Sequence, residues 1–225
     1  MEEIKALDDF LASAGKESSS ELRKKFSSVK MKRGQFVFFE GDHASSLYFI
    51  ESGIIEANAI HSDGRVYIHQ FMFPGDIFGE GIVYGKERYP FSAMVRKDAT
   101  LWKISREDFL QALEKDDGLK NRIIEILGKR LEFSLLKARC IAGERVEKRV
   151  ACILLKTVNE KGLYPECLER IDMPITNRDI SGLIGTTEET VSRIMSRLKR
   201  DGIIAVRKKQ IVILDRKALT GFLSD

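Results

Sequence analysis

The sequence of 225 residues lacks the features that mark secreted, zinc-binding and membrane proteins. Its three cysteines, Cys140, Cys152 and Cys167, are an odd number and share no close metal-site spacing. They predict reduced thiols in a cytoplasm and not a disulfide framework. No apolar run approaches the roughly 18 residues of a membrane span, and the start M-E-E-I-K is unlike a signal peptide. We therefore expect a cytoplasmic protein with no membrane partner.

The charge of the chain is small overall but unevenly placed. The formal net charge is +4, and 43% hydrophobic with 32% charged residues is typical of a globular chain of one large or two modest domains. Residues 1–143 contain 22 basic and 22 acidic residues, so the whole excess lies beyond Gly143. Between Thr190 and Lys209 seven basic residues outnumber a single acid, Asp201. This distribution indicates contact with nucleic-acid phosphates.

The stretch Thr186–Arg200 has the pattern of a recognition helix. It follows a short apolar segment that ends in Gly185, an order that predicts a helix-turn-helix. Thr187 is a candidate N-cap, and Glu188 would lie in the first turn, where the helix dipole favours acids. The apolar face at helical spacing comprises Val191, Ile194, Met195 and Leu198.

A second face of this helix supplies the candidate base contacts. Glu189, Ser192 and Arg193 bring an acceptor, a hydroxyl and a guanidinium together, a set suited to base edges in a major groove. Alternatively, Thr186 and Glu189 fit a capping box, in which Glu189 would bond the backbone. The candidate DNA-binding residues are Thr187, Glu188, Glu189, Ser192, Arg193, Arg197, Lys199 and Lys208.

A basic hairpin is predicted after the recognition helix. The runs Ile203–Val206 and Ile211–Leu214 flank Arg207-Lys208-Lys209, so the tip of the hairpin carries three cations. We expect this wing to lie against the DNA backbone. Before the helix-turn-helix we expect a helix over Arg145–Val158 and a loop over Lys161–Pro174.

The N-terminal half predicts a β-rich domain preceded by helices. Residues 4–26 read as one or two amphipathic helices, with Ser18–Ser20 as an N-cap. The residues expected to face inward are Ile4, Leu7, Phe10 and Leu11. Glycine-punctuated runs then indicate a barrel or sandwich, with a hairpin turn at Ser62–Arg65. The runs are Phe36–Phe39, Leu47–Ile50, Ile54–Ile60, Val66–Phe71, Phe91–Val95 and Leu101–Ile104.

A long helix is predicted over Phe109–Ala142. Alternating steps of three and four residues give an apolar seam whose proposed dimer contacts are Ile124, Leu127, Leu131, Ala138 and Ile141. Further apolar residues, expected to face the β-domain, are Ile123, Ile126, Leu135 and Leu136. The commoner use of such a stripe is packing on the core of its own domain. The length of the helix favours a dimer.

Four motifs resemble the CRP/FNR family of bacterial transcription regulators. They are G-D-H-A-S-S-L-Y-F-I-E-S-G (Gly41–Gly53), F-P-G-D-I-F-G-E (Phe73–Glu80), S-A-M-V-R (Ser92–Arg96) and I-T-N-R-D-I-S-G-L-I-G-T-T-E-E-T-V-S-R (Ile175–Arg193). The resemblance covers nearly the whole chain. It implies an α+β fold with an N-terminal β-roll (a cyclic-nucleotide-binding-like jelly roll), a long dimerisation helix and a C-terminal winged helix-turn-helix.

The same resemblance implies the domain limits and the partners. The β-roll sensing domain would span residues 1–110, the dimerisation helix 111–143 and the winged helix-turn-helix 144–225. The expected partners are double-stranded DNA, a second copy of the chain, RNA polymerase and an effector bound between the β-roll and the long helix. No enzymatic activity is expected.

The reading pattern resembles the FNR-like branch of the family. Glu189, Ser192 and Arg193 match its E-x-x-S-R pattern. Members with this pattern read half-sites of the TTGA kind, with the Arg on the guanine and the Glu near the complementary cytosine. The cyclic-AMP branch has Gly at the place of Ser192 and Arg at the place of Glu188. The resemblance implies a TTGA-like palindrome and leaves the outer bases open.

The sensor departs from the cyclic-nucleotide pattern. Cyclic-AMP binders carry Arg-Ser/Thr-Ala, whose Arg pairs with the cyclic phosphate, and Phe91 stands at that Arg position here. Ser134-Leu135 also lacks the pair of hydroxyls that meets the adenine across the dimer. A cyclic nucleotide is therefore not the expected ligand. The candidate effector residues are Phe78, Gly79, Glu80, Tyr89, Phe91, Ser92, Leu131, Ser134 and Leu135.

Other sensing chemistries and one other function class remain open. FNR-type iron–sulfur sensing is excluded because the first cysteine is Cys140. Haem bound by His43, His61 or His69, or oxidation of Cys140, would each make a gas or redox sensor. A cupin-type metal enzyme would use His61, His69 and Glu80, but the two histidines are eight residues apart and its basic C-terminus would have no role. The effector and any cofactor are not identified by the sequence.

Overall fold

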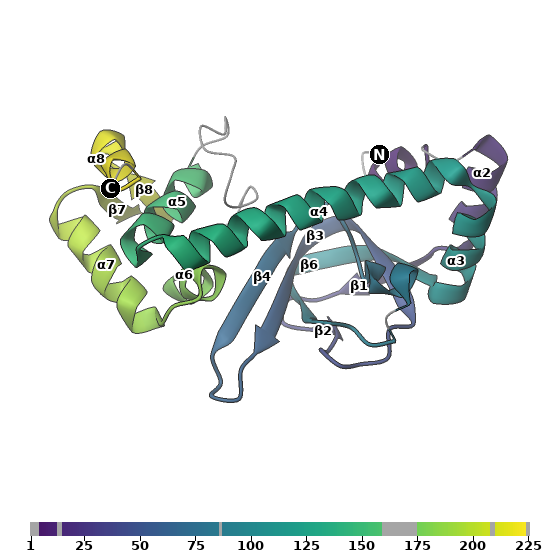
Figure 1. The fold of residues 1–225 in the computed structure, drawn as a ribbon, viewed down its shortest axis with the longest axis horizontal. Helices are drawn as coiled ribbons and strands as arrows, with labels where there is room; N and C mark the ends of the chain where they lie inside the picture. The colour runs from purple at the N-terminus through teal and green to yellow at the C-terminus, as the bar shows by residue number, and fades with distance from the viewer. Residues whose placement is uncertain (1–4, 13–14, 86, 159–174, 208–209, 224–225) are drawn as a thin grey trace. The chain divides into compact units, whose positions relative to one another are not determined.

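The computed structural model describes residues 5–12, 15–85, 87–158, 175–207 and 210–223 (Figure 1). Unit 1 comprises Met1–Ala59 and His69–Gly128, and unit 2 comprises Ile60–Ile68 and Lys129–Asp225. The predicted α+β fold is confirmed: a β-sheet domain precedes a long helix and a helix-turn-helix. No helix in the described part of the chain is long and apolar enough to cross a membrane.

Unit 1 is built on one antiparallel sheet with the strand order β1-β6-β3-β4, in which β2 pairs with β6 and β5 pairs with β3. Helices precede and follow it. The elements are α1 (Lys5–Leu11), α2 (Lys16–Lys25), β1 (Ser27–Met31), β2 (Phe36–Phe38), β3 (Ser46–Ile60), β4 (Val66–Met72), β5 (Ile77–Phe78), η1 (Glu80–Tyr84), β6 (Ser92–Ser105) and α3 (Arg106–Lys115). The long helix α4 (Asp117–Gly143) and the hairpin of β3 and β4 continue into unit 2.

Strand β3 joins two runs that the sequence presents as separate strands. It continues through Gly53, with register shifts against β6 between Ile50 and Ile55. Gly53 has φ +99°, and a Cβ there would lie 2.5 Å from Ala99. The pairing of β3 with β6 continues through this irregularity, because glycine tolerates both the positive φ and the close approach of Ala99 on β6. Strand β6 likewise joins two predicted runs, Phe91–Val95 and Leu101–Ile104. Strands β1 and β5 were not predicted.

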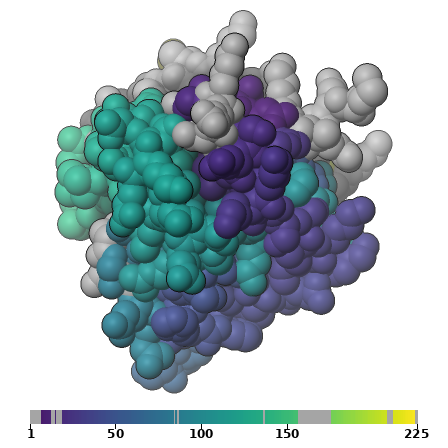
Figure 2. Space-filling view, turned by 90° about the vertical axis from the view of Figure 1, so that its right-hand side faces the viewer, coloured from purple at the N-terminus to yellow at the C-terminus, as the bar shows by residue number. Residues whose placement is uncertain are grey.

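The N-terminal helices cover the end of unit 1. In Figure 2 their purple surface lies beside the teal surface of α3 and α4. Leu7, Phe10 and Leu11 are buried as predicted, whereas Ile4 lies outside the described residues. The predicted Ser18–Ser20 cap is wrong, because these residues lie inside α2, whose N-cap is Gly15.

The predicted single helix over Phe109–Ala142 is two helices, separated at Asp116. The backbone of Asp116 is extended, with φ −135° and ψ 109°. One carboxylate oxygen accepts from the backbone N–H of Leu119 and the other from that of Gly15, each at 2.9 Å. Asp116 therefore ends α3 and caps α4, since an acceptor at this place satisfies an otherwise unpaired helix N–H.

The first half of α4 closes the core of unit 1. Leu119 and Ile123 are buried in one cluster with the sheet residues, and Ile126 and Leu127 pack partly buried against it. The prediction that Ile123 and Ile126 face the β-domain is confirmed. For Leu135 it is wrong, because its side chain is 62% exposed, and the side chain of Leu136 lies outside the described residues.

Unit 2 contains the tip of the β3–β4 hairpin, the second half of α4 and the C-terminal elements. These are α5 (Val146–Val158), α6 (Asn177–Ile184), α7 (Glu188–Arg200), β7 (Ile204–Arg207), β8 (Gln210–Ile213) and α8 (Arg216–Gly221). Helix α5 confirms the helix predicted before the helix-turn-helix, and it packs against α6, α8 and β8. The predicted loop Lys161–Pro174 lies outside the described residues.

The expectation of reduced thiols is wrong for Cys140. Cys140, near the end of α4, takes part in a disulfide bond, whereas Cys152 on α5 retains its thiol. Sequence spacing could not indicate this, because a disulfide requires the fold to bring two Cα atoms within about 7 Å.

Candidate DNA-binding surface and sensor site

The first helix of the helix-turn-helix is fixed at both ends. The hydroxyl of Thr176 accepts from the N–H of Asp179 at 3.2 Å, and the carboxylate of Asp179 accepts from the N–H of Thr176 at 2.9 Å. This reciprocal capping box starts α6. Gly185 ends the helix in the left-handed conformation, with φ 65°, which glycine adopts at least cost. The turn between α6 and α7 therefore has a defined geometry.

The second helix starts at the predicted cap. The hydroxyl of Thr187 accepts from the N–H of Thr190 at 3.2 Å. The alternative capping box between Thr186 and Glu189 is thereby excluded, because Thr190 occupies the third helical position. The predicted apolar face is buried and comprises Val191, Ile194, Met195 and Leu198. Burial of this stripe fixes the rotation of α7 about its own axis.

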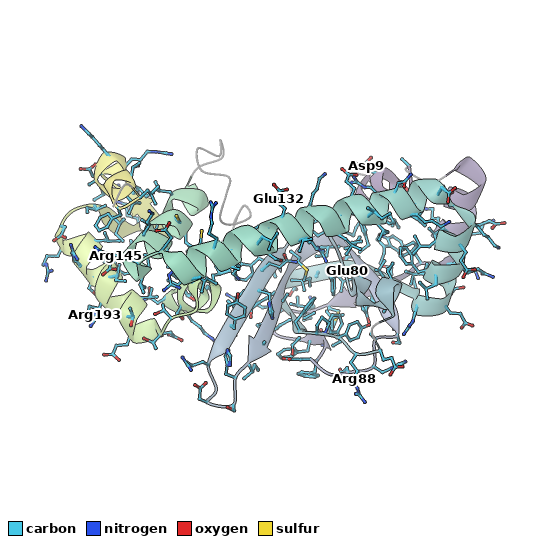
Figure 3. The ribbon with its side chains drawn as sticks, in the orientation of Figure 1. Asp9, Glu80, Arg88, Glu132, Arg145 and Arg193 are labelled. Carbon is cyan, nitrogen blue, oxygen red and sulfur yellow. The ribbon has the colours of Figure 1, made fainter. Side chains whose placement is uncertain are left out.

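The opposite face of α7 carries the candidate base contacts. Glu189, Ser192 and Arg193 are all exposed, and Figure 3 shows Arg193 on this helix. Glu188, Lys199 and Thr187 are exposed as well. The structure therefore places the predicted residues of α7 and its cap outside the protein core. Lys208 lies outside the described residues.

Among the described residues, the ion-pair partner of Arg197 is Asp201, and the pair is weak. Its Nε lies 3.7 Å from a carboxylate oxygen of Asp201, and Arg200 lies 3.8 Å from the same carboxylate. The side chain of Arg197 is 55% exposed, so the pair is screened by solvent and costs little to break. Both guanidinium groups are therefore available to phosphates.

The predicted wing is confirmed as an antiparallel hairpin. Ile204 pairs with Ile213 and Arg207 pairs with Gln210. Arg207 is exposed at the end of β7. The basic tip Lys208–Lys209 lies outside the described residues.

The candidate sensor site in unit 1 is rich in aromatic rings. Phe91 lies 5.9 Å from Phe38 and 5.9 Å from His69, measured between ring centroids. Phe38 in turn stacks on Tyr89 at 3.6 Å with an interplanar angle of 11°. The position at which the cyclic-nucleotide pattern requires a phosphate-binding Arg therefore belongs to an aromatic cluster.

Hydrogen bonds fix the surroundings of this cluster. The hydroxyl of Tyr89 donates to the carbonyl of Ser46 at 2.8 Å and accepts from its N–H at 3.1 Å. Gly79 has φ 83°, and a Cβ there would lie 2.8 Å from the same carbonyl oxygen. Glycine is therefore required before Glu80, which is 8% exposed. Ser92 is buried, and its hydroxyl accepts from the N–H of Glu40 at 2.9 Å.

A buried polar network near the site was missed by the sequence reasoning. Glu56 is 2% exposed, and its carboxylate accepts from Arg96 at 2.8 Å and from Asn58 at 2.6 Å. The guanidinium of Arg96 also lies 5.6 Å from the ring centroid of Phe71. A glutamate within the apolar run Ile54–Ile60 could have revealed it, because a buried carboxylate needs a cation. Arg96 is thus committed to a structural ion pair.

The long-helix candidates for the effector site and for the dimer contact are mostly exposed. Leu131 and Leu135 are 61% and 62% exposed, and Ser134 is also exposed. Ile124 is 65% exposed, Ala138 is exposed and Ile141 is half-buried. Leu127 alone among the proposed dimer contacts packs against the core of unit 1.

The proposed metal ligands are not gathered. Within the described ranges no three His, Cys, Asp or Glu side chains come together as a metal site would require. His61 is exposed beside the hairpin turn, and His43 is exposed on the strand bridge to Arg88. The cupin-type alternative therefore has no site in the described part of the chain.

Two protein families match successive parts of the chain. Residues 28–116 match the cyclic nucleotide-binding domain, and residues 148–222 match the Crp-like helix-turn-helix domain. Among curated proteins, the cyclic AMP receptor protein of Thermus thermophilus is 28% identical over 172 residues, 76% of each chain. The fumarate and nitrate reduction regulatory protein of Salmonella typhi is 27% identical over 192 residues, 84% of this chain and 75% of the relative. These relatives are transcription regulators and not enzymes.

Solved structures share the fold. The c-di-GMP responsive global regulator CLP of Xanthomonas campestris has a TM-score of 0.73 at 22% identity, covering 88% of this chain and 99% of its own. A Crp/Fnr-family regulator from Eubacterium rectale has a TM-score of 0.76 at 19% identity, covering 94% and 95%. At these identities the likeness concerns the fold alone.

Proposed function

Because the chain belongs to the CRP/FNR family of transcription regulators, we propose that it works as a homodimer that reads a TTGA-type palindrome. The observation that carries the proposal is the exposed face of Glu189, Ser192 and Arg193 on a helix whose opposite face is buried. A fork from Arg193 to guanine O6 and N7 and an acceptor on Glu189 for the cytosine amino group suit that sequence. RNA polymerase would then be the partner at the promoter.

The dimer contact would run along α4. Ile124, Leu131 and Leu135 are large apolar side chains left more than 60% exposed at spacings of seven and four residues. Such a stripe on one helix face is typical of a coiled-coil seam, in which a second copy removes it from water. Two reading heads would then contact half-sites about one helical turn apart.

The effector would bind beside the aromatic cluster and would not be a cyclic nucleotide. Phe91 provides no charge for a cyclic phosphate, and Arg96 is already paired with Glu56. A phosphate that binds without a neighbouring cation loses its hydration, and no ion pair offsets most of that desolvation free energy. The rings of Phe38, Tyr89 and Phe91 suit an apolar or aromatic effector instead.

Two variants on two duplexes test the reading assignment. Arg193→Ala should weaken binding to a TTGA palindrome by about 1–3 kcal/mol per base contact and leave binding to random duplex almost unchanged. Arg197→Ala, which removes a phosphate contact one turn along α7, should weaken both complexes alike and lower the salt slope by about one. Fluorescence-anisotropy titrations at several salt concentrations measure both.

Equal losses on the two duplexes for Arg193→Ala would refute base reading and leave non-specific DNA binding. Binding that does not respond to salt would refute the basic helix and wing as the contact surface.

A further inference from the structure

Helix α6, the first helix of the helix-turn-helix, is buried along most of its length. Its buried residues run without a break from Asp179 to Ile184. A helix that is buried on every face needs neighbours on every face. Helices α5 and α7 are two of them. A further neighbour is the tip of the β3–β4 hairpin, residues Ile60–Ile68, which belongs to unit 2 with α6.

The contact between the hairpin tip and α6 is close because residue 182 has no side chain. A Cβ on Gly182 would lie 2.8 Å from Cγ1 of Ile68 and 3.1 Å from the carbonyl oxygen of Val66. Ile68 is itself 1% exposed. The backbone of α6 therefore packs directly on the side chain of Ile68, and a change of side-chain volume there alters the support of the helix.

Ile68 is also bound to the second half of α4. Its backbone carbonyl accepts a hydrogen bond of 2.7 Å from the buried ammonium of Lys137. A charged donor that is shielded from water makes a stronger bond than a neutral or exposed one. Through its carbonyl and its side chain, Ile68 thus connects α4 to α6.

The helix-turn-helix is therefore attached to α4 by two routes. The first follows the chain from α4 into α5, where Nη1 of Arg149 donates to the carbonyl of Ile184 at the end of α6. The second passes through the hairpin tip. A body with a single attachment can rotate about it, whereas a second attachment fixes its angle. Because α7 packs on α6, the angle of α6 to α4 also sets the angle of the recognition helix.

We propose that the hairpin tip positions the helix-turn-helix for reading DNA, with Ile68 and Lys137 as positioning residues that touch no base. The inference rests on the proposed reading of a palindrome by two copies. Each copy must hold its recognition helix at a fixed angle to α4, because the two half-sites are contacted together.

The docked hairpin is compatible with DNA binding. Glu189, Ser192 and Arg193 are exposed while the tip contacts α6, so the reading face stays open. A helix-turn-helix that is already held at its angle loses less freedom when it binds, and this preorganisation raises the affinity for the palindrome.

Titrations of the full chain onto a TTGA-type palindrome and onto a random duplex of equal length test the inference. Ile68→Ala removes the side-chain atoms that meet α6, and Lys137→Met removes the ammonium and keeps an unbranched apolar side chain. Each should lower the ratio of palindrome affinity to random-duplex affinity about tenfold, because a loosely held head must be ordered on binding. The control Ile60→Ala, on the same hairpin at a residue 57% exposed, should leave the ratio unchanged.

The ratio separates positioning from stability. A smaller fraction of folded protein lowers both affinities by the same factor, and so leaves the ratio as it was. Ile68→Val, which removes only one methyl group, should keep most of the preference for the palindrome. If Ile68→Ala does not fold, Lys137→Met and Ile68→Val carry the test.

The inference is overturned if a folded Ile68→Ala or Lys137→Met chain keeps the wild-type ratio or binds the palindrome more tightly, or if Ile60→Ala loses the ratio equally. A wild-type chain without preference for the palindrome would refute the proposed reading and not the support of α6. Hydrogen exchange without DNA then decides. Ile68→Ala should speed exchange of the α6 amides and Ile60→Ala should not, and equal exchange in the two variants would overturn the role of the hairpin tip.

Discussion

The ammonium of Lys137 on α4 donates a hydrogen bond of 2.7 Å to the backbone carbonyl of Ile68 on β4. Lys137 is 6% exposed, and its Nζ also lies 4.6 Å from the ring centroid of Tyr67. The tip of the β3–β4 hairpin is thus attached to the second half of α4 by a buried cation. Desolvation of this ammonium lowers the pKa of Lys137 to about 8.

The buried lysine predicts a pH dependence of stability. The pKa of Lys137 is about 8 in the folded chain, against an ordinary value of 10.5. Between these values the unfolded chain binds a proton that the folded chain does not, so the free energy of unfolding rises with pH. Below pH 8 both states hold the proton, and this contribution is constant.

Lys137→Met should remove a rise of the order of 3 kcal/mol between pH 8 and pH 10.5. Denaturant unfolding at a series of pH values measures the difference between each variant and the wild-type chain. The control, Lys217→Met, removes an exposed lysine and should keep the rise. A rise of equal size in both variants would contradict the assignment to Lys137.

Gly182 predicts a packing defect where α6 meets the hairpin tip. A Cβ at this residue of α6 would lie 2.8 Å from Cγ1 of Ile68 and 3.1 Å from the carbonyl oxygen of Val66. Gly182→Ala should therefore destabilise the chain by about 1–3 kcal/mol despite the better helix propensity of alanine. In α8, a Cβ at Gly221 meets nothing within 4 Å, so Gly221→Ala should be neutral or slightly stabilising. Thermal unfolding of both variants measures the difference in stability. Equal stabilities of Gly182→Ala and Gly221→Ala would contradict the close packing of α6 on the hairpin.

The exposed stripe on α4 predicts the assembly. Leu131→Lys should break the homodimer, because it places two charges opposite each other in an apolar seam. The control is Glu132→Lys, since Glu132 is exposed on the next position of the same helix (Figure 3). Light scattering at micromolar concentration should give a monomer for the first variant and a dimer for the second. If Leu131→Lys remained dimeric, the interface would have to lie elsewhere.

The aromatic cluster predicts that cyclic nucleotides do not bind at micromolar concentration. Phe91 replaces the charge that would pair with the phosphate, and it is packed near Phe38 and His69. Calorimetric titration with cyclic AMP and cyclic GMP should give no saturable heat. Micromolar binding of either would refute the proposed effector chemistry and would assign the phosphate to another cation.

Features encoded by neighbouring residues could be predicted from the sequence. The Thr187 cap, the buried stripe of α7 and the wing hairpin each depend on residues a few positions apart. Strand β1 was missed because Ser27–Met31 is largely polar and gains its place by pairing with β6, far along the chain. The helix break at Asp116 was missed for the same reason, since one of its two hydrogen bonds comes from Gly15.

In the candidate sites, too, some features depend on neighbouring residues and others on residues far apart in the sequence. The exposed face of Glu189, Ser192 and Arg193 follows from helical periodicity alone. The ion pair of Glu56 with Arg96, the ring neighbours of Phe91 and the contact of Gly182 with Ile68 join residues at least 22 positions apart. Periodicity carries no information at that range, because only the folded chain sets those distances.

The backbone passes between the two units three times, after Ala59, after Ile68 and after Gly128. A reading head excised from Lys129 onward would therefore lack the hairpin tip that belongs to it. In that fragment the ammonium of Lys137 would lose its carbonyl acceptor, and the surface of α6 at Gly182 would lie bare to water. A fragment cut within the long helix is therefore an incomplete unit 2. Studies of unit 2 in isolation require residues 60–68 to be supplied with residues 129–225.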